Sequence, residues 1–443
     1  MPSWRCCPES NTNKRGYAVI DYLPIALLVA LLAIGAPIYL SLGLSALLGF
    51  YIADLPLMAS AEIVYNSLTP FTLMAVPFFV ITANLMTAGG ISDALVKFAR
   101  VWVGHLWGGL GVATILACAI FSAISGSSVA TALAIGSISI PAMVAAGYER
   151  SYAMGVTAAG GTLGILIPPS IPLILYGFIT DQSVVALFSA TLVPGLLAVA
   201  SLLICAMLIA RFKNYPRRPR AAMPERIAAL KEATPSLLLP VLILGGIYGG
   251  IYTPTEAAIV AVVYSVLISQ VFYKKMGFLD ILRIMGKSMI DTSAIMIILA
   301  AAMLLGHYLS IVELGFRVAD AVQGLGLHPL QFNLLIMAIL LVLGMFMEAT
   351  SMLLIMVPML LPAMVALGVN PVHFAVLFVI AMEIGLITPP IGMNLYVVTR
   401  SGQGALQEAI RGSVPYVGML ILLALLVLLM PATALWLPQW LGR

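Results

Sequence analysis

Residues 164–172 read GILIPPSIP, a stretch that places a glycine and three prolines inside an otherwise apolar segment. A proline in a helix interior removes a backbone donor and clashes with the preceding turn, which costs about 3 kcal/mol or more. A helix that stops there also leaves the carbonyl oxygens of its last turn without partners. The stretch therefore predicts an interrupted helix, and the surrounding sequence must supply a reason for it.

The composition of the chain indicates a membrane protein. Of its 443 residues, 62% are hydrophobic and 9% are charged, whereas about 25% of residues are charged in a typical soluble domain. Apolar segments of about 20 residues, the length of a membrane-spanning helix, recur through the chain. We therefore expect an all-α, multi-pass integral membrane protein embedded in the lipid bilayer. The net charge is only +4 and the basic residues lie in loops, so nucleic acid is not an expected partner.

The chain divides into a tail, two apolar halves and a linker. Residues 1–21 are polar and predict an N-terminal tail in the cytoplasm. The halves cover 22–210 and 235–443, and the linker 211–234 carries seven lysine and arginine residues. Because basic residues in short loops mark the cytoplasmic side, we expect the linker there. The amphipathic segment 273–288 predicts a helix that lies along the membrane surface.

An internal repeat relates the two halves. The two Pro-Pro pairs begin at Pro168 and Pro389, 221 residues apart, and PAMVAAG at 141–147 matches PAMVALG at 362–368 with the same offset. Related halves with interrupted helices at matching positions are typical of secondary transporters, whose site lies at the repeat interface near the bilayer midplane. We predict two repeats of opposite membrane orientation, although the offset itself shows only that the halves are related.

Each half carries a further interruption, made of small and hydroxyl-bearing residues. In the first half it is AISGSSVAT at 123–131, between two apolar arms. The 221-residue offset places Ser127 on Glu348, within GMFMEATSM at 344–352. Irregular backbone at membrane depth is tolerated only where protein or a water-filled cavity satisfies its polar groups. We therefore predict two re-entrant helical hairpins with their tips at a cavity, and one unwound helix beside each.

Hydroxyls and unpaired carbonyl oxygens at such breaks are suitable ligands for Na⁺. The candidate ligands of a first site are the hydroxyls of Ser125 and Ser127 and the carbonyls around Gly164 and Ile167. The candidate ligands of a second site are Glu348, Thr350, Thr388 and the carbonyls near Gly385. The alternative is that each Pro-Pro pair only kinks a helix while the serines bond the preceding turn, and the second copy at one offset favours the ion sites.

Glu348 is the acid that most needs a partner. No lysine or arginine lies within 30 positions of it, and a charge in an apolar span is costly unless a cation or a proton accompanies it. Glu383 and Asp291 lie nearer the expected span ends, where we expect them at interfaces rather than as ligands. The candidate substrate contacts beside the breaks are Ser128, Asn394 and Tyr396.

At these residues the chain resembles the large membrane subunit, the DctM-type permease, of tripartite ATP-independent periplasmic (TRAP) transporters. The likeness runs from about residue 22 to residue 437. Its most specific stretches are VPFFVITANLM, SAISGSSVATALAIGSISIPAM, GTLGILIPPSIPLILYG, GMFME and GLITPPIGMNLYV. The resemblance implies an importer of the bacterial inner membrane that is driven by two or more Na⁺ ions and moves like an elevator. It also implies a small membrane subunit and a periplasmic substrate-binding protein as partners.

The resemblance assigns ion ligands residue by residue. For the first Na⁺ site these are Ser125, Ser127, Gly164, Ile167 and Pro169. For the second site they are Glu348, Gly385 and Thr388. Family members commonly have aspartate where this chain has Glu348, so the longer side chain is a departure at the second site.

Other functions have less support in the sequence. No stretch of the form GxxxxGK[ST] occurs, so ATP hydrolysis by this chain is not expected. An intramembrane enzyme with a tip serine is one alternative, but no GxSxG motif occurs and the duplicated breaks would have no use in it. A proton- or Na⁺-coupled carrier of organic anions without a binding protein is another. C4-dicarboxylates, 2-oxoacids and sugar acids would all suit the site, so the substrate stays open.

Overall fold

The structure is a computed structural model that describes residues 21–442, apart from 218, 315, 316, 318, 319, 321–323, 325 and 327. The described part is helical and contains no β-strand. Nine of its helices are long and apolar enough to cross a membrane. The predicted polar tail lies outside the described residues, except for Asp21.

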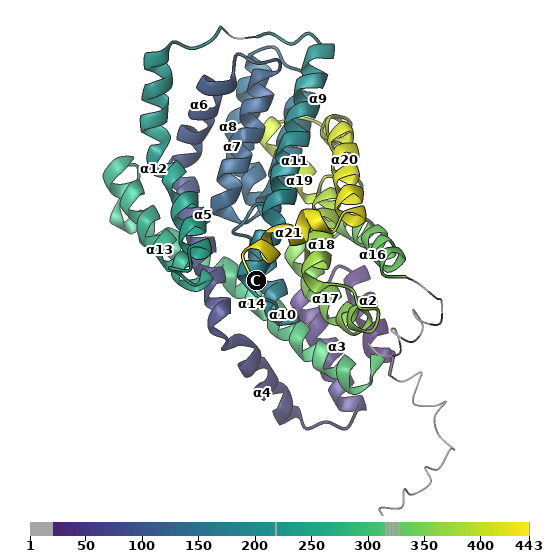
Figure 1. The fold of residues 1–443 in the computed structure, drawn as a ribbon. Helices are drawn as coiled ribbons and strands as arrows, with labels where there is room; N and C mark the ends of the chain where they lie inside the picture. Colours follow the sequence, from purple (N-terminus) through teal and green to yellow (C-terminus); the bar gives the residue numbers. More distant parts are fainter. Residues whose placement is uncertain are drawn as a thin grey trace, which may run out of the picture.

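Figure 1 shows the helices in chain order. The elements of the first half are α2 (Leu23–Ala33), α3 (Ile38–Ile52), α4 (Leu57–Leu68), η1 (Phe71–Met74), α5 (Ala75–Ala88), α6 (Ile91–Val103), α7 (Gly109–Ser125), α8 (Ser128–Ala145), α9 (Arg150–Leu166), α10 (Ile171–Thr180) and α11 (Val184–Phe212). Those of the second half are α12 (Met223–Tyr248), α13 (Pro254–Leu267), η2 (Ile268–Phe272), α14 (Phe278–Ile311), α16 (Pro329–Gly344), α17 (Ala349–Ala366), α18 (Pro371–Leu386), α19 (Met393–Gly402), α20 (Leu406–Leu429) and α21 (Ala432–Trp440).

The helix bounds follow the 221-residue offset. Helix α17 begins and ends 221 residues after α8, while α18 and α19 follow α9 and α10 at this offset to within one residue. The contacts between the halves are reciprocal, because α10 packs against α17 and α19 packs against α8. In Figure 1, α10 and α17 accordingly lie side by side. This exchange agrees with two related halves, and their opposite membrane orientation stays a prediction.

One hydrogen bond also recurs at the offset. The backbone N–H of Ile171 donates to the carbonyl of Gly126 at 3.5 Å, and that of Gly392 donates to the carbonyl of Met345 at 3.0 Å. In each half, therefore, the residue just before or at the start of the helix after the Pro-Pro pair is bonded to the turn between α7 and α8 or its counterpart between α16 and α17.

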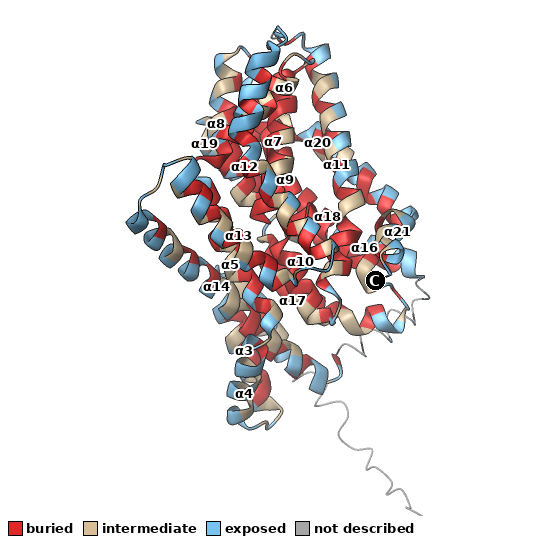
Figure 2. Cartoon of the chain, turned by 60° about the vertical axis from the view of Figure 1, so that its left-hand side comes forward, coloured by how far each residue is buried: buried red, intermediate tan, exposed pale blue. Residues whose placement is uncertain are grey.

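The core of the molecule is formed by the two interrupted segments themselves. Every residue from Tyr152 to Gly177 and from His373 to Ile387 is buried, and Figure 2 shows α9, α10 and α18 as largely buried helices inside a partly exposed shell. Small residues allow this close packing in a membrane protein. A Cβ atom on Gly155 of α9, for example, would collide with the backbone of Gly412 of α20.

Three sequence-based expectations are corrected. The segment 273–288 is not a separate surface helix, because Phe278 begins α14 and this helix continues without a break to Ile311. Its 34 residues span about 51 Å at 1.5 Å per residue, which exceeds the bilayer core of about 30 Å. The linker is loop only as far as residue 222, where α12 begins with Met223. Helices α4 and α6 were not expected as elements.

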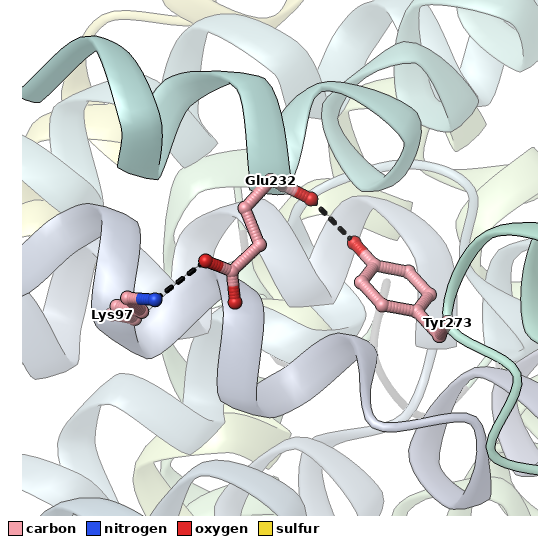
Figure 3. Close-up of polar contacts among 3 residues, drawn as sticks. All are labelled: Lys97, Glu232 and Tyr273. Atoms are coloured by element: carbon pink, nitrogen blue, oxygen red, sulfur yellow. Dashed lines mark hydrogen bonds and ion pairs between the residues drawn. The ribbon is translucent and has the colours of Figure 1, made fainter.

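Polar contacts hold the outer helix α12 against α6 (Figure 3). Lys97 Nζ lies 2.5 Å from Glu232 Oε2, and the Tyr273 hydroxyl donates to the Glu232 carbonyl at 2.8 Å. Because both charged side chains are about half exposed, this ion pair contributes at most about 1 kcal/mol. Helix α6 in turn packs against α7, the first arm of the first hairpin.

Candidate functional site

The first predicted hairpin consists of α7 and α8, joined by a two-residue turn. Gly126 ends α7 with a φ of 60°, a left-handed conformation that glycine adopts without penalty. Ser127 caps α8, since its hydroxyl oxygen accepts a hydrogen bond from the N–H of Ala130 at 3.4 Å. Ser125 is fully buried and its hydroxyl lies 2.8 Å from that of Thr131. The turn therefore concentrates hydroxyl and carbonyl oxygens at one point.

The break after α9 packs directly against this tip. Gly164, in the last turn of α9, has no room for a side chain, because a Cβ atom would collide with the carbonyl of Ser127. A Cβ atom on Gly126 would lie 2.8 Å from the carbonyl oxygen of Pro169. Ile167 is the extended residue that ends α9. The structure thus brings the first set of predicted ligands to one turn and the adjoining break. They are Ser125, Ser127, Gly164, Ile167 and Pro169.

The second tip has a carboxylate where the first has a hydroxyl. Glu348 caps α17: its Oε2 accepts a hydrogen bond from the N–H of Ser351 at 3.1 Å, and its Oε1 accepts one from the Thr350 hydroxyl at 2.9 Å. Glu348 and Ser127 therefore occupy the same capping position in the two halves. A carboxylate at a helix N-terminus also interacts favourably with the helix dipole, so Glu348 has a structural role whether or not it binds an ion.

The second break meets its tip through glycine. A Cβ atom on Gly385 would lie 2.6 Å from the Cα of Gly344, the last residue of α16. Thr388 instead donates its hydroxyl to the carbonyl of Ile384, one turn earlier, at 2.6 Å. The structure therefore brings Gly385 to the second hairpin, whereas no described contact joins Thr388 to Glu348.

Both tips face a single cavity of about 200 Å³. Ser128, Ile171 and Ala349 line it, so the N-termini of α8, α10 and α17 all open onto it. A further wall comes from outside the hairpins, where Asn84 of α5 and Asp291 of α14 line the same space. Helix N-termini favour negative charge, and the cavity therefore offers anion-binding ends next to the oxygen-rich tips.

The predicted substrate residues separate in the structure. Ser128 lines the cavity. Asn394 is fully buried and donates from Nδ2 to the Ser128 hydroxyl oxygen at 2.8 Å, so it supports the tip rather than lining the cavity. Tyr396 is 46% exposed and does not line the cavity.

Two acids were misplaced by sequence reasoning. Glu383, expected at an interface, is only 2% exposed in α18 and accepts a hydrogen bond from the Ser128 hydroxyl at 2.9 Å. Asp291, also expected near a span end, lies in the interior of α14 and faces the cavity. A signal for Glu383 was present, since it stands two residues before Gly385 in the second break. For Asp291 the missing information was the continuity of α14.

Comparison with known proteins identifies the family. The family model described as "Tripartite ATP-independent periplasmic transporter, DctM component" matches residues 25–433. The chain belongs to this family. A C4-dicarboxylate TRAP transporter large permease protein DctM from Vibrio cholerae is 40% identical over 434 residues, which cover 93% of this chain and 96% of that protein. The protein of the same name from Pseudomonas aeruginosa is 42% identical over 403 residues, 91% of this chain and 94% of that protein.

The TRAP permease shares its fold with more distant transporters. The YdaH transporter of Alcanivorax borkumensis superposes with a TM-score of 0.65 at 13% identity, over 85% of this chain and 89% of that chain. Family and apolar helices together make this chain a multi-pass protein of the bacterial inner membrane. Its family is one of transporter permeases, not of enzymes.

Proposed function

We propose that this TRAP permease imports a small organic acid by Na⁺ symport. The observation that carries the proposal is the single cavity bounded by both hairpin tips, each of which packs against or is bonded to a broken helix. Every break supplies carbonyl oxygens at the end of one helix and N–H groups at the start of the next. The first kind of group binds Na⁺ and the second binds a carboxylate.

Na⁺ suits the chemistry of the candidate ligands. They are hydroxyl and carbonyl oxygens at the first tip, and a carboxylate with a hydroxyl at the second. Two ions would therefore bind in different electrostatic surroundings, one among neutral ligands and one beside Glu348. The ligand sets remain as predicted: Ser125, Ser127, Gly164, Ile167 and Pro169 for the first ion, and Glu348, Thr350, Gly385 and Thr388 for the second.

The cargo class and the partners follow from the family. Listed by what they are named for, relatives of this chain include transporters of C4-dicarboxylates, of sialic acid and of 2,3-diketo-L-gulonate. We infer that this chain also takes an organic acid, received from a periplasmic binding protein, and that it works with a small membrane subunit. We further propose that the two halves are inverted repeats and that the hairpins and broken helices move together in an elevator-type cycle.

The test is uptake of labelled organic acids by liposomes that contain this chain, its small subunit and a periplasmic binding protein. We expect accumulation with an inward Na⁺ gradient and none when K⁺ replaces Na⁺. Accumulation driven by a proton gradient without Na⁺ would contradict the ion assignment. Full-rate uptake by this chain alone would contradict the need for partners.

A further inference from the structure

The charged side chains that line the cavity are all negative. Asp291 and Glu348 line it, and no lysine, arginine or histidine does so among the described residues. A charge that is removed from bulk water is costly unless it is compensated. The contents of the cavity must therefore supply the positive charge.

A count of charges restricts the cargo. This step rests on the proposed function, in which two Na⁺ ions offset the two lining carboxylates. A dicarboxylate would then add two uncompensated negative charges and a simple monocarboxylate one, whereas a zwitterion would add none. The helix ends do not alter this count, because each break contributes one positive N-terminus and one negative C-terminus.

Asp291 is available for a cationic group. It lies on the wall formed by α5 and α14, away from the capping residues at the tips. No described residue forms an ion pair or hydrogen bond with it, and Lys287, one turn earlier on α14, neither pairs with it nor lines the cavity. One turn away on the same helix, Ser288 accepts a hydrogen bond from Asn84 at 2.9 Å. This contact joins α5 to α14 beside Asp291.

We propose that the cargo is a small carboxylate that also carries a cationic nitrogen, and that Asp291 selects for that nitrogen. The carboxylate binds at the N-termini of α8 and α17, and the ammonium group binds at Asp291. The cavity volume of about 200 Å³ lies below the 300–1,000 Å³ of common ligand pockets. It therefore suits a compact molecule such as a short amino acid.

The experiment compares matched probes that differ only in the amino group. The pairs are propionate with alanine, propionate with β-alanine, butanoate with 4-aminobutanoate, and succinate with aspartate. Binding to the purified complex of this chain and its small subunit is followed by the unfolding midpoint, in NaCl and in KCl. The binding protein is left out, so its own selectivity does not enter. Because the pairs vary the distance between carboxylate and ammonium, a site of this design must respond to at least one of them.

We expect at least one amino probe to bind in NaCl at a concentration about tenfold to a hundredfold below that of its partner, the range for a hydrogen-bonded charged contact. Asp291→Asn should abolish this preference, Asp291→Glu should retain part of it, and Lys287→Gln, the control on the same helix, should leave it unchanged. The unfolding midpoint of each variant without probe reports whether the fold survives.

The outcomes separate the two proposals. Na⁺-dependent binding of the amine-free members alone, or a preference that survives Asp291→Asn, would overturn the assignment of Asp291 and leave Na⁺ symport standing. Binding that is equal in NaCl and KCl would instead contradict the proposed function. If none of the probes binds, the zwitterionic cargo is refuted.

Discussion

Replacement of Glu348 by glutamine separates its structural role from its proposed role as an ion ligand. In the structure the carboxylate caps α17, through the N–H of Ser351 at 3.1 Å and the Thr350 hydroxyl at 2.9 Å. Glutamine keeps one carbonyl oxygen for the cap but loses the negative charge. The change in the helix cap and dipole should therefore cost only about 0.5 to 1 kcal/mol of stability.

The effect on Na⁺ should be larger. A carboxylate beside a bound cation escapes most of the cost of a buried charge, and its loss leaves the ion among neutral ligands. We expect Na⁺ binding to weaken by about 1.4 to 3 kcal/mol, which corresponds to about tenfold to a few hundredfold in the half-saturating concentration. Glu348→Asp keeps the charge and a good capping residue, so it should retain partial activity. Ser127→Ala, at the matching position of the first half, removes one neutral ligand and should weaken Na⁺ dependence less.

The assay is uptake by liposomes over a series of Na⁺ concentrations, at matched protein content, with the unfolding midpoint in KCl as the measure of the cap. A raised Na⁺ requirement with a nearly unchanged midpoint in KCl is the expected result for Glu348→Gln. If this variant keeps the wild-type Na⁺ requirement, Glu348 is a helix cap only. The second site must then be built from carbonyls and hydroxyls.

Gly385→Ala should abolish transport and lower stability by about 1 to 3 kcal/mol, because its Cβ atom would lie 2.6 Å from the backbone of Gly344; thermal unfolding and uptake check this. Gly418→Ala, where a Cβ atom meets nothing within 4 Å, is the control and should change neither, and equal losses in both variants would contradict the packing argument. In the loops, the hydrogen bond from Lys213 holds the pKa of Glu149 below its ordinary value of 4.5, so this contact stabilises the protein at neutral pH and is lost as the pH falls through the lowered pKa. Lys213→Met should therefore reduce stability by less than about 1 kcal/mol at pH 7, with no difference from wild type at a pH below that pKa; a difference that persists in acid would contradict this origin.

The breaks and the repeat could be predicted because their causes are local. A Pro-Pro pair ends a helix wherever it stands, and two copies at one offset place both breaks without knowledge of the packing. The tip residues Ser127 and Glu348 followed from the same offset, and the structure gives both the same capping position. Whether these residues bind Na⁺ is a separate matter that the uptake series above must decide.

The wall of the cavity could not be predicted, because it depends on which helices pack together. Hydropathy lowers the score of a segment at every charge, so Lys287 and Asp291 divided what is one continuous helix, α14. Glu383 was misjudged for a related reason: its burial comes from the helices that surround α18, and nothing in its own segment records them. Burial and cavity lining are properties of the assembled bundle.

The buried contacts across the two halves favour a core that moves as one unit. Asn394 of α19 donates to Ser128 at 2.8 Å, and Ser128 donates to Glu383 of α18 at 2.9 Å, so the first tip is held by the second half. Each such buried bond would cost about 1 to 3 kcal/mol if it were broken without replacement. A rocking motion of one half against the other would have to break this chain of contacts, whereas an elevator motion of both hairpins and both broken helices together would preserve it. The same linkage means that a shift at the second break reaches the first tip directly, so occupation of the two proposed ion sites should be coupled.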